Sequence, residues 1–279
     1  MALAATLQDR GELASLPPAP VRDRAERGQA LARLRASIGA IERGQGRHAA
    51  LPLAPGLDPG LPWGGLPRGA LHEMTGGQAA FGFLAAVLSA VVADGGQVLW
   101  CQTAHAANEA GELYGAGLAH WGIAPDRLVI ARARNTQDML WAMEEGLRSA
   151  AVAAVVGEAA RVSLTANRRL QLAAETTGAL AFLLDRLPRV GVTTASAATT
   201  AALTRWRVSP ARTGSDHAPR WQVDLDYCRG GPSRAWQLEW RPGASMTHDP
   251  HDPAYRRDPG GLAVVAELRD RPAGGRAVA

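Results

Sequence analysis

Residues 64–93, GGLPRGALHEMTGGQAAFGFLAAVLSAVVA, are the stretch that decides the fold. They predict a short apolar strand at 70–74, then a glycine-bearing turn, and then an unbroken apolar helix. Strand, glycine loop and helix in this order are the layout of a P-loop, in which backbone N–H groups and a helix N-terminus hold phosphates. Counted from Gly77, the spacing of G-x-x-x-x-G-K-[ST] survives, because Gly82 falls five residues later.

The two side chains that handle phosphate in this motif are missing. The lysine position is Phe83 and the Ser/Thr position is Leu84. No other register supplies a lysine, because all 30 Lys or Arg residues of the chain are arginine. Without the lysine the loop lacks a cation for the β- and γ-phosphates, and without the Ser/Thr it lacks a direct Mg²⁺ ligand. Backbone amides could still hold a phosphate here, but a tight turn is favoured. The residues of this vestigial site are Gly76, Gly77 and Gly82.

The composition is that of a folded protein with a modest positive charge. Of the 279 residues 47% are hydrophobic, and the length suits one large or two small domains. The net charge is +4. An arginine-only surface suits phosphate or carboxylate partners, because a guanidinium binds both through paired hydrogen bonds. The codon usage of a GC-rich genome is the simpler explanation of the arginine.

Cysteine usage and hydropathy indicate a cytoplasmic protein without a metal. Cys101 and Cys228 have no metal-ligand spacing and suggest no disulfide framework, which favours a reducing compartment. The sequence HDPHDP at 248–253 lacks a recognisable ligand set, so we predict neither a metal nor another cofactor. We see no signal peptide, and no apolar run reaches the ~20 residues of a membrane-spanning helix.

The chain divides into an arm, a core and a C-terminal region, which we place at 1–50, 51–210 and 211–279. In the arm, 21–43 predict a helix with one apolar stripe, because aliphatic residues recur every three or four positions. Such a stripe packs on the protein's own core or docks on another protein. Docking on another protein is our hypothesis for partner binding. Its residues are Leu31, Leu34, Ile38 and Ile41.

Strands and helices alternate through the core. We expect strands at 97–102, 127–131, 151–156 and 179–184, and helices at 106–121, from 135 onwards and at 163–176. This order predicts an α/β fold, a parallel sheet flanked by helices. Segments 203–208, 221–227 and 235–240 alternate polar and apolar residues, which is typical of antiparallel strands with one wet face. Beyond 243 the chain is polar, and we expect it to fray.

At this point the core resembles the ATPase core of the RecA recombinases. The similarity begins with GGLPRG at 64–69 and continues at Ala104, where recombinases carry the glutamate of Glu-His-Ala. After the apolar strand a Walker B aspartate is expected, and this chain has Gly157, with only Glu158 beside it. Together with Phe83 and Leu84, four parts of one catalytic apparatus are lost, which predicts a protein that is not an enzyme.

The same resemblance suggests where DNA would contact the protein. Arg186 and Arg189 follow the strand after which recombinases place a DNA-contacting loop, and Arg205 and Arg207 could extend a basic strip from them. Single-stranded DNA is usually held by aromatic side chains as well, and residues 186–202 contain none. We therefore expect weak DNA contact at most.

The degenerate core, the arm, and the sequence TRWRVSPAR at 204–212 before tryptophan-rich strands are together similar to the ImuA family. The resemblance implies a non-catalytic, cytoplasmic adaptor in SOS-induced mutagenic translesion synthesis. Its implied partners are RecA, ImuB and an error-prone DNA polymerase III alpha-type subunit. Two alternatives remain. One is the cell-division inhibitor SulA, whose relatives share the eroded core but are shorter and lack the arm. The other is a regulatory nucleotide-binding switch.

Overall fold

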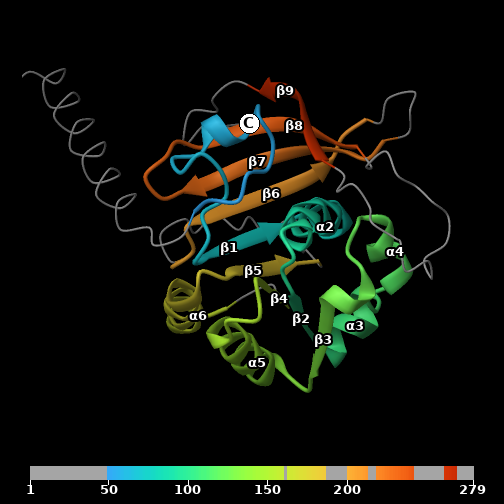
Figure 1. Cartoon of the computed structure of the whole chain (residues 1–279), viewed down its shortest axis with the longest axis vertical. Helices are drawn as coiled ribbons and strands as arrows, with labels where there is room; N and C mark the ends of the chain where they lie inside the picture. The colour runs from blue at the N-terminus through green and yellow to red at the C-terminus, as the bar shows by residue number, and fades with distance from the viewer. Residues whose placement is uncertain (1–48, 160–161, 187–199, 213–217, 242–260, 269–279) are drawn as a thin grey trace, which may run out of the picture.

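The computed structural model describes residues 49–159, 162–186, 200–212, 218–241 and 261–268 (Figure 1). Four expected partner-binding residues and one expected DNA contact lie outside the described residues, namely Leu31, Leu34, Ile38, Ile41 and Arg189.

The described residues form a nine-stranded sheet with the order β3-β2-β4-β5-β1-β6-β7-β8-β9. Its strands are β1 Ala70–Thr75, β2 Val98–Thr103, β3 Leu128–Ala133, β4 Ala154–Glu158, β5 Leu180–Asp185, β6 Thr204–Pro210, β7 Arg220–Cys228, β8 Arg234–Arg241 and β9 Gly261–Leu268. The helices are α2 Gly77–Ala93, α3 Ala104–Ala110, α4 Gly115–His120, α5 Thr136–Arg148 and α6 Leu164–Thr177, with short 3-10 turns at Asp58–Gly60 and Pro125–Arg127.

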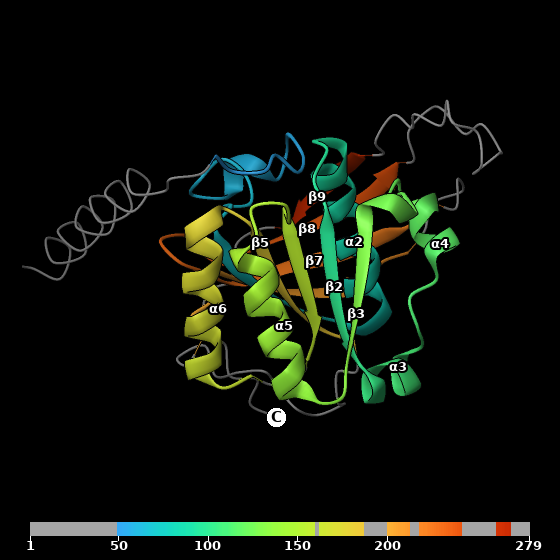
Figure 2. The ribbon, with the colours of Figure 1, turned by 60° about the horizontal axis from the view of Figure 1, so that its bottom comes forward.

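The first six strands pair in parallel, and helices lie on both faces of this part of the sheet. Helix α2 lies on one face, and α5 and α6 lie on the other (Figure 2). Strands β4 and β5 are buried along their whole length, as continuous apolar strands in a parallel sheet should be. The expected fold class, an α/β parallel sheet flanked by helices with an antiparallel C-terminal extension, is confirmed.

Three details differ from the expected elements. The helix expected at 106–121 is two helices, because α3 ends at Gly111, whose φ of 84° no helical residue adopts. The segment at 203–208 is not purely antiparallel, because β6 pairs in parallel with β1 and antiparallel with β7. The tail expected to fray contains β9, which pairs antiparallel with β8 over residues rich in Val, Leu and Ala.

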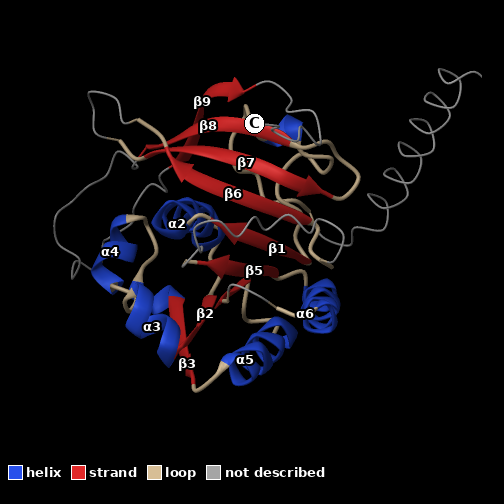
Figure 3. Ribbon diagram, turned by 180° about the vertical axis from the view of Figure 1, so that it is seen from behind, coloured by secondary structure: helices blue, strands red, loops and turns tan. Residues whose placement is uncertain are grey.

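The antiparallel strands β6 to β9 continue the sheet beyond the region that α5 and α6 cover (Figure 3). Their tryptophans point to the α2 face, where they join the larger apolar core. This core holds Trp206 and Trp236 at 0% exposure, Trp240 at 4% and Trp221 at 5%. Core packing therefore accounts for the tryptophan-rich pattern of these strands.

His72 on β1 is buried and links this strand to β6. Its Nε2 donates to the Pro67 carbonyl at 3.1 Å, because a carbonyl can only accept. Its Nδ1 therefore carries no proton and accepts from the Thr204 hydroxyl at 2.7 Å. That hydroxyl oxygen accepts in turn from Trp206 Nε1 at 2.7 Å. Burial lowers the pKa of His72 to about 3, because a charged ring would lose its hydration there.

We expect His72 to lower the free energy of unfolding by about 2 kcal/mol between pH 7 and pH 5. The unfolded chain takes up the proton near the usual pKa of 6.5, whereas the folded protein resists it down to about 3. The unfolded state binds more protons in that window, so stability falls as the pH drops from 6.5 towards 3. Urea unfolding at the two pH values measures the change.

The variant His72→Gln isolates this contribution from other titrating groups. Glutamine keeps one donor and one acceptor but does not titrate, so the variant should be less stable at pH 7 and less sensitive to pH. The prediction fails if the variant and the wild type show the same pH dependence.

Candidate functional site

In open α/β sheets, ligands bind outside the carboxyl ends of the parallel strands. In this protein β1, β2, β4 and β5 end on the same side of the sheet, where α2 begins. Two parts of the expected nucleotide site meet there, the glycine turn after β1 and the acidic residue at the end of β4.

The glycine turn is too short to be a P-loop. Strand β1 ends at Thr75 and α2 begins at Gly77, so only Gly76 lies between them. Residues 77–82, which have the P-loop spacing of glycines, are therefore helix rather than loop. Gly76 has a φ of 135°, and a Cβ there would lie 1.9 Å from the Val208 carbonyl oxygen of β6. Packing of the turn against the neighbouring strand explains why this residue must be glycine.

The position of the P-loop lysine faces the apolar core. Phe83 is 0% exposed, and its ring centroid lies 6.0 Å from that of Trp206 and 6.3 Å from that of Trp221. A Cβ on Gly82 would approach the Trp221 ring to 3.1 Å. Of the three glycines predicted for a vestigial phosphate site, Gly76 and Gly77 lie at the turn, and Gly82 packs against tryptophan inside the helix.

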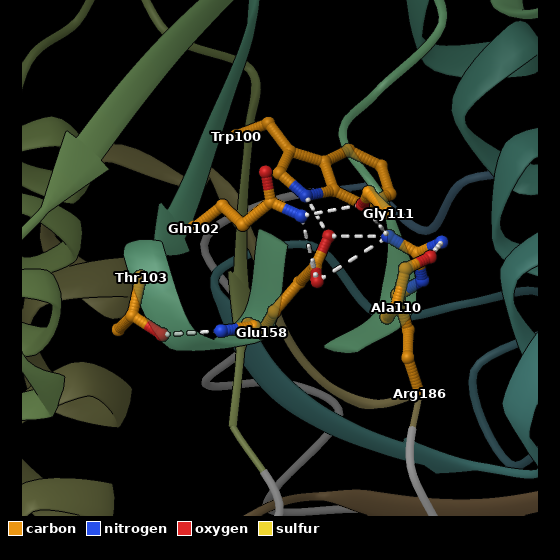
Figure 4. A network of polar contacts seen from close by, with 8 residues as sticks. Trp100, Gln102, Thr103, Ala110, Gly111, Glu158 and Arg186 are labelled. Carbon is orange, nitrogen blue, oxygen red and sulfur yellow. Dashed lines mark hydrogen bonds and ion pairs between the residues drawn. The ribbon is translucent and has the colours of Figure 1, made fainter. Parts of the chain in front are cut away.

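The end of β4 carries a buried carboxylate, Glu158, at the centre of a polar cluster (Figure 4). Glu158 accepts hydrogen bonds from Trp100 Nε1 at 2.8 Å and from Gln102 Nε2 at 3.2 Å, both on β2. It also accepts from Arg186 Nη1 at 3.2 Å. The Glu158 side chain is 2% exposed and that of Arg186 is 6% exposed, so the ion pair is almost completely removed from water.

Arg186 joins this cluster to the segment that connects α3 and α4. Its Nη2 donates to the Ala110 carbonyl at 2.7 Å, and its Nη1 also donates to the Gly111 carbonyl at 3.2 Å. Its guanidinium carbon lies 4.8 Å from the centre of the Phe81 ring on α2, a cation–π distance. Arg186 therefore neutralises Glu158 and ties the ends of β4 and β5 to α2 and α3.

The orientation of Glu158 corrects the expectation that the Walker B position is Gly157. A Cβ on Gly157 would lie 2.2 Å from Met143 Sδ of α5, so this residue faces away from α2. Side chains alternate along a strand, so the next residue, Glu158, faces α2. Its partner Arg186 lies over the Phe81 ring of α2, which agrees with this direction. A Walker B acid must face the helix after the P-loop to share its metal ion. The carboxylate is thus present on the correct side, paired with an arginine.

The position of the water-activating glutamate, Ala104, begins α3 and is exposed. Its neighbour Thr103 caps this helix, since the Thr103 hydroxyl accepts from the Ala106 N–H at 3.1 Å. The pattern Thr-Ala-His-Ala therefore starts a short helix.

The arginines predicted to contact DNA do not form one strip. Arg186 lies on the α2 face in its buried ion pair, whereas Arg205 Nε donates to Glu73 Oε2 at 2.8 Å. Glu73 also accepts from Asn167 of α6, which places that pair on the opposite face. Arg207 pairs with Asp226 at 2.7 Å and with Asp224 at 3.4 Å. Each of the three described arginines is thus neutralised by a carboxylate of the protein itself.

The two cysteines, for which the sequence predicted neither a metal site nor a disulfide, are both buried. Burial raises the pKa of the Cys101 and Cys228 thiols to about 12 in each case, so neither is a ready nucleophile or metal ligand. Among the described residues, no three His, Cys, Asp or Glu side chains are grouped as a metal site would need. Within the same residues no helix is long and apolar enough to span a membrane.

Known proteins are similar to this chain in sequence and in fold. No protein-family model matches the chain. Over 214 residues it is 36% identical to Protein ImuA of Caulobacter vibrioides strain NA1000 / CB15N, which covers 71% of this chain and 84% of that protein. Protein ImuA of strain ATCC 19089 of the same organism gives the same values. The crystal structure of the RadB recombinase aligns with a TM-score of 0.49 and 12% identity, covering 67% of this chain and 93% of that chain.

Proposed function

Because this chain belongs to the ImuA family, we propose that it is a non-catalytic accessory protein of DNA-damage-induced mutagenic translesion synthesis. It acts in the cytoplasm as an adaptor, binding RecA on one side and the assembly of ImuB with an error-prone polymerase on the other. The observation that carries the non-catalytic part is the buried pair of Glu158 and Arg186.

This pair supports the proposal because it removes the charge that a nucleotide-bound metal ion would need. In P-loop enzymes the acid after this strand holds Mg²⁺, which neutralises the phosphates during transfer. Here a guanidinium takes the place of the cation, and Glu158 accepts two further hydrogen bonds from β2. Freeing the carboxylate would leave Arg186 buried and unpaired, which typically costs 3–5 kcal/mol.

We expect the purified protein to release no phosphate from ATP above a buffer control, with or without single-stranded DNA. The reason is that the lysine position is buried in the core and the acid is paired with arginine. A phosphate-release assay with Mg²⁺ measures this. RecA purified from the same host serves as the positive control. Turnover that requires Mg²⁺ and follows the protein through successive columns would contradict the proposal.

The adaptor part of the proposal is tested by binding. We expect Leu34→Asp and Ile38→Asp together to weaken binding to purified RecA at least about tenfold, because two aliphatic contacts of the proposed stripe are lost. Surface plasmon resonance on immobilised RecA measures the affinity, and Leu172→Asp, an exposed residue of α6, is the matched control.

Circular dichroism shows whether the double variant is folded, which distinguishes two results that would contradict this expectation. A double variant that unfolds would assign the stripe to the protein's own core. A folded double variant that binds RecA normally would contradict docking through this stripe.

A further inference from the structure

A groove of about 440 Å³ is lined by residues of α5 and α6 and of the segment before α6. The two helices lie side by side on the face of the sheet opposite α2 (Figure 2). Its volume is within the range of small-ligand sites, which is enough to bury a bulky side chain with its neighbours. Six of its lining residues matter for its chemistry. They are Leu140, Trp141, Glu144, Val162, Arg169 and Leu170.

The groove has an apolar floor and an exposed aromatic wall. Leu170 at its base is 1% exposed, and Leu140 beside it is half-buried. Trp141 is 63% exposed, although tryptophan is usually well buried in folded proteins. An exposed tryptophan beside an apolar pocket is typical of the residues that dominate protein–protein binding energies.

The charged lining residue that faces solvent is Arg169. The Glu144 side chain is 8% exposed and pairs with both Arg148 and Arg169. The Arg169 side chain is 62% exposed, so the carboxylate is covered and this guanidinium faces outwards. Arg148 lies outside the lining and also pairs with the exposed Glu145 at 2.7 Å. Within the described part of the chain, Arg169 makes no other hydrogen bond, and most of its five donors remain for a ligand.

We propose that this groove docks a short peptide segment of a partner protein in which a bulky apolar residue adjoins an aspartate or glutamate. The apolar side chain enters between Trp141 and Leu170, and the carboxylate pairs with Arg169. A guanidinium and a carboxylate make strong paired hydrogen bonds, which fix the direction of the segment. A nucleic acid could pair with the Arg169 guanidinium and stack a base on Trp141, but it would gain nothing from the apolar floor at Leu170.

The experiment selects random short peptides displayed on phage against the full-length protein. Enriched peptides are then synthesised with a fluorophore for measurement by anisotropy. We expect them to combine a large aliphatic or aromatic residue with an adjacent acid. Trp141→Ala and Arg169→Gln should each weaken their binding at least about tenfold, the usual effect of losing a central contact.

Two variants on α6 are matched controls. Leu172→Ala removes an apolar side chain that is 62% exposed but outside the groove, and Arg168→Gln removes the neighbouring exposed arginine. Both should bind the peptides as the wild type does. Thermal unfolding should show that all four variants are folded, since each changes a largely exposed residue.

Three results would overturn the proposal. The first is that no peptide with an apolar residue next to an acidic one is enriched, or that Trp141→Ala leaves the affinity of the enriched peptides unchanged. The second is that a single-stranded oligonucleotide binds more tightly than any enriched peptide and with dependence on Arg169, which would make the surface a nucleic-acid site. The third is that the protein self-associates in sedimentation and that Trp141→Ala abolishes this, which would assign the groove to a second copy of the chain.

Discussion

Replacing Phe83 by lysine is expected to unfold the protein, although the change restores the P-loop lysine in the sequence. Phe83 is 0% exposed and packs between Trp206 and Trp221. Losing this ring costs about 3–5 kcal/mol, and an ammonium group without a partner adds a further penalty. The loss approaches the whole stability of a typical domain, about 5–15 kcal/mol. Urea unfolding followed by circular dichroism measures it.

Two variants separate packing from the effect of a new lysine. Phe83→Leu keeps an apolar side chain and should cost less than about half as much, because only part of the volume is lost. Gln78→Lys places the lysine on an exposed position of the same helix and should leave stability nearly unchanged. A Phe83→Lys protein with the wild-type urea midpoint that also binds ATP would disprove this account of α2.

The order of strands and helices could be predicted from the sequence because each core strand is a continuous apolar run between helix signals. Asn135 shows how local such a signal can be. Its side chain accepts from the Asp138 N–H at 2.9 Å and starts α5 where the sequence places it. Ser163 likewise caps α6, accepting from the Ala166 N–H at 3.3 Å. Capping depends on residues three apart, so no tertiary information is needed.

The length of the glycine turn and the direction of Glu158 could not be predicted in this way. The spacing from Gly77 to Gly82 is the same in a loop and in a helix, and the close approach of Gly76 to Val208 of β6 joins segments far apart in the sequence. The partner of Glu158, Arg186, is 28 residues away on another strand end. Strand β9 was missed because its pairing with β8 depends on residues that are far apart in the sequence.

The coupling energy between the charges of Glu158 and Arg186 can be measured with three variants. They are Glu158→Leu, Arg186→Leu and the double variant. Each single change leaves one buried charge without its partner and should cost about 3–5 kcal/mol of unfolding free energy. The double variant should cost clearly less than the sum, because leucines can occupy a site from which both charges are gone. Urea unfolding of the four proteins gives the coupling energy.

The two single variants should also differ in where they act. Arg186 holds the carbonyls of Ala110 and Gly111, so Arg186→Leu should speed hydrogen exchange in residues 104–114 more than Glu158→Leu does. If the two single costs add to within about 0.5 kcal/mol, the charges are not coupled. Glu158 would then be available to a metal ion, and its contact with Arg186 would no longer support a non-catalytic role.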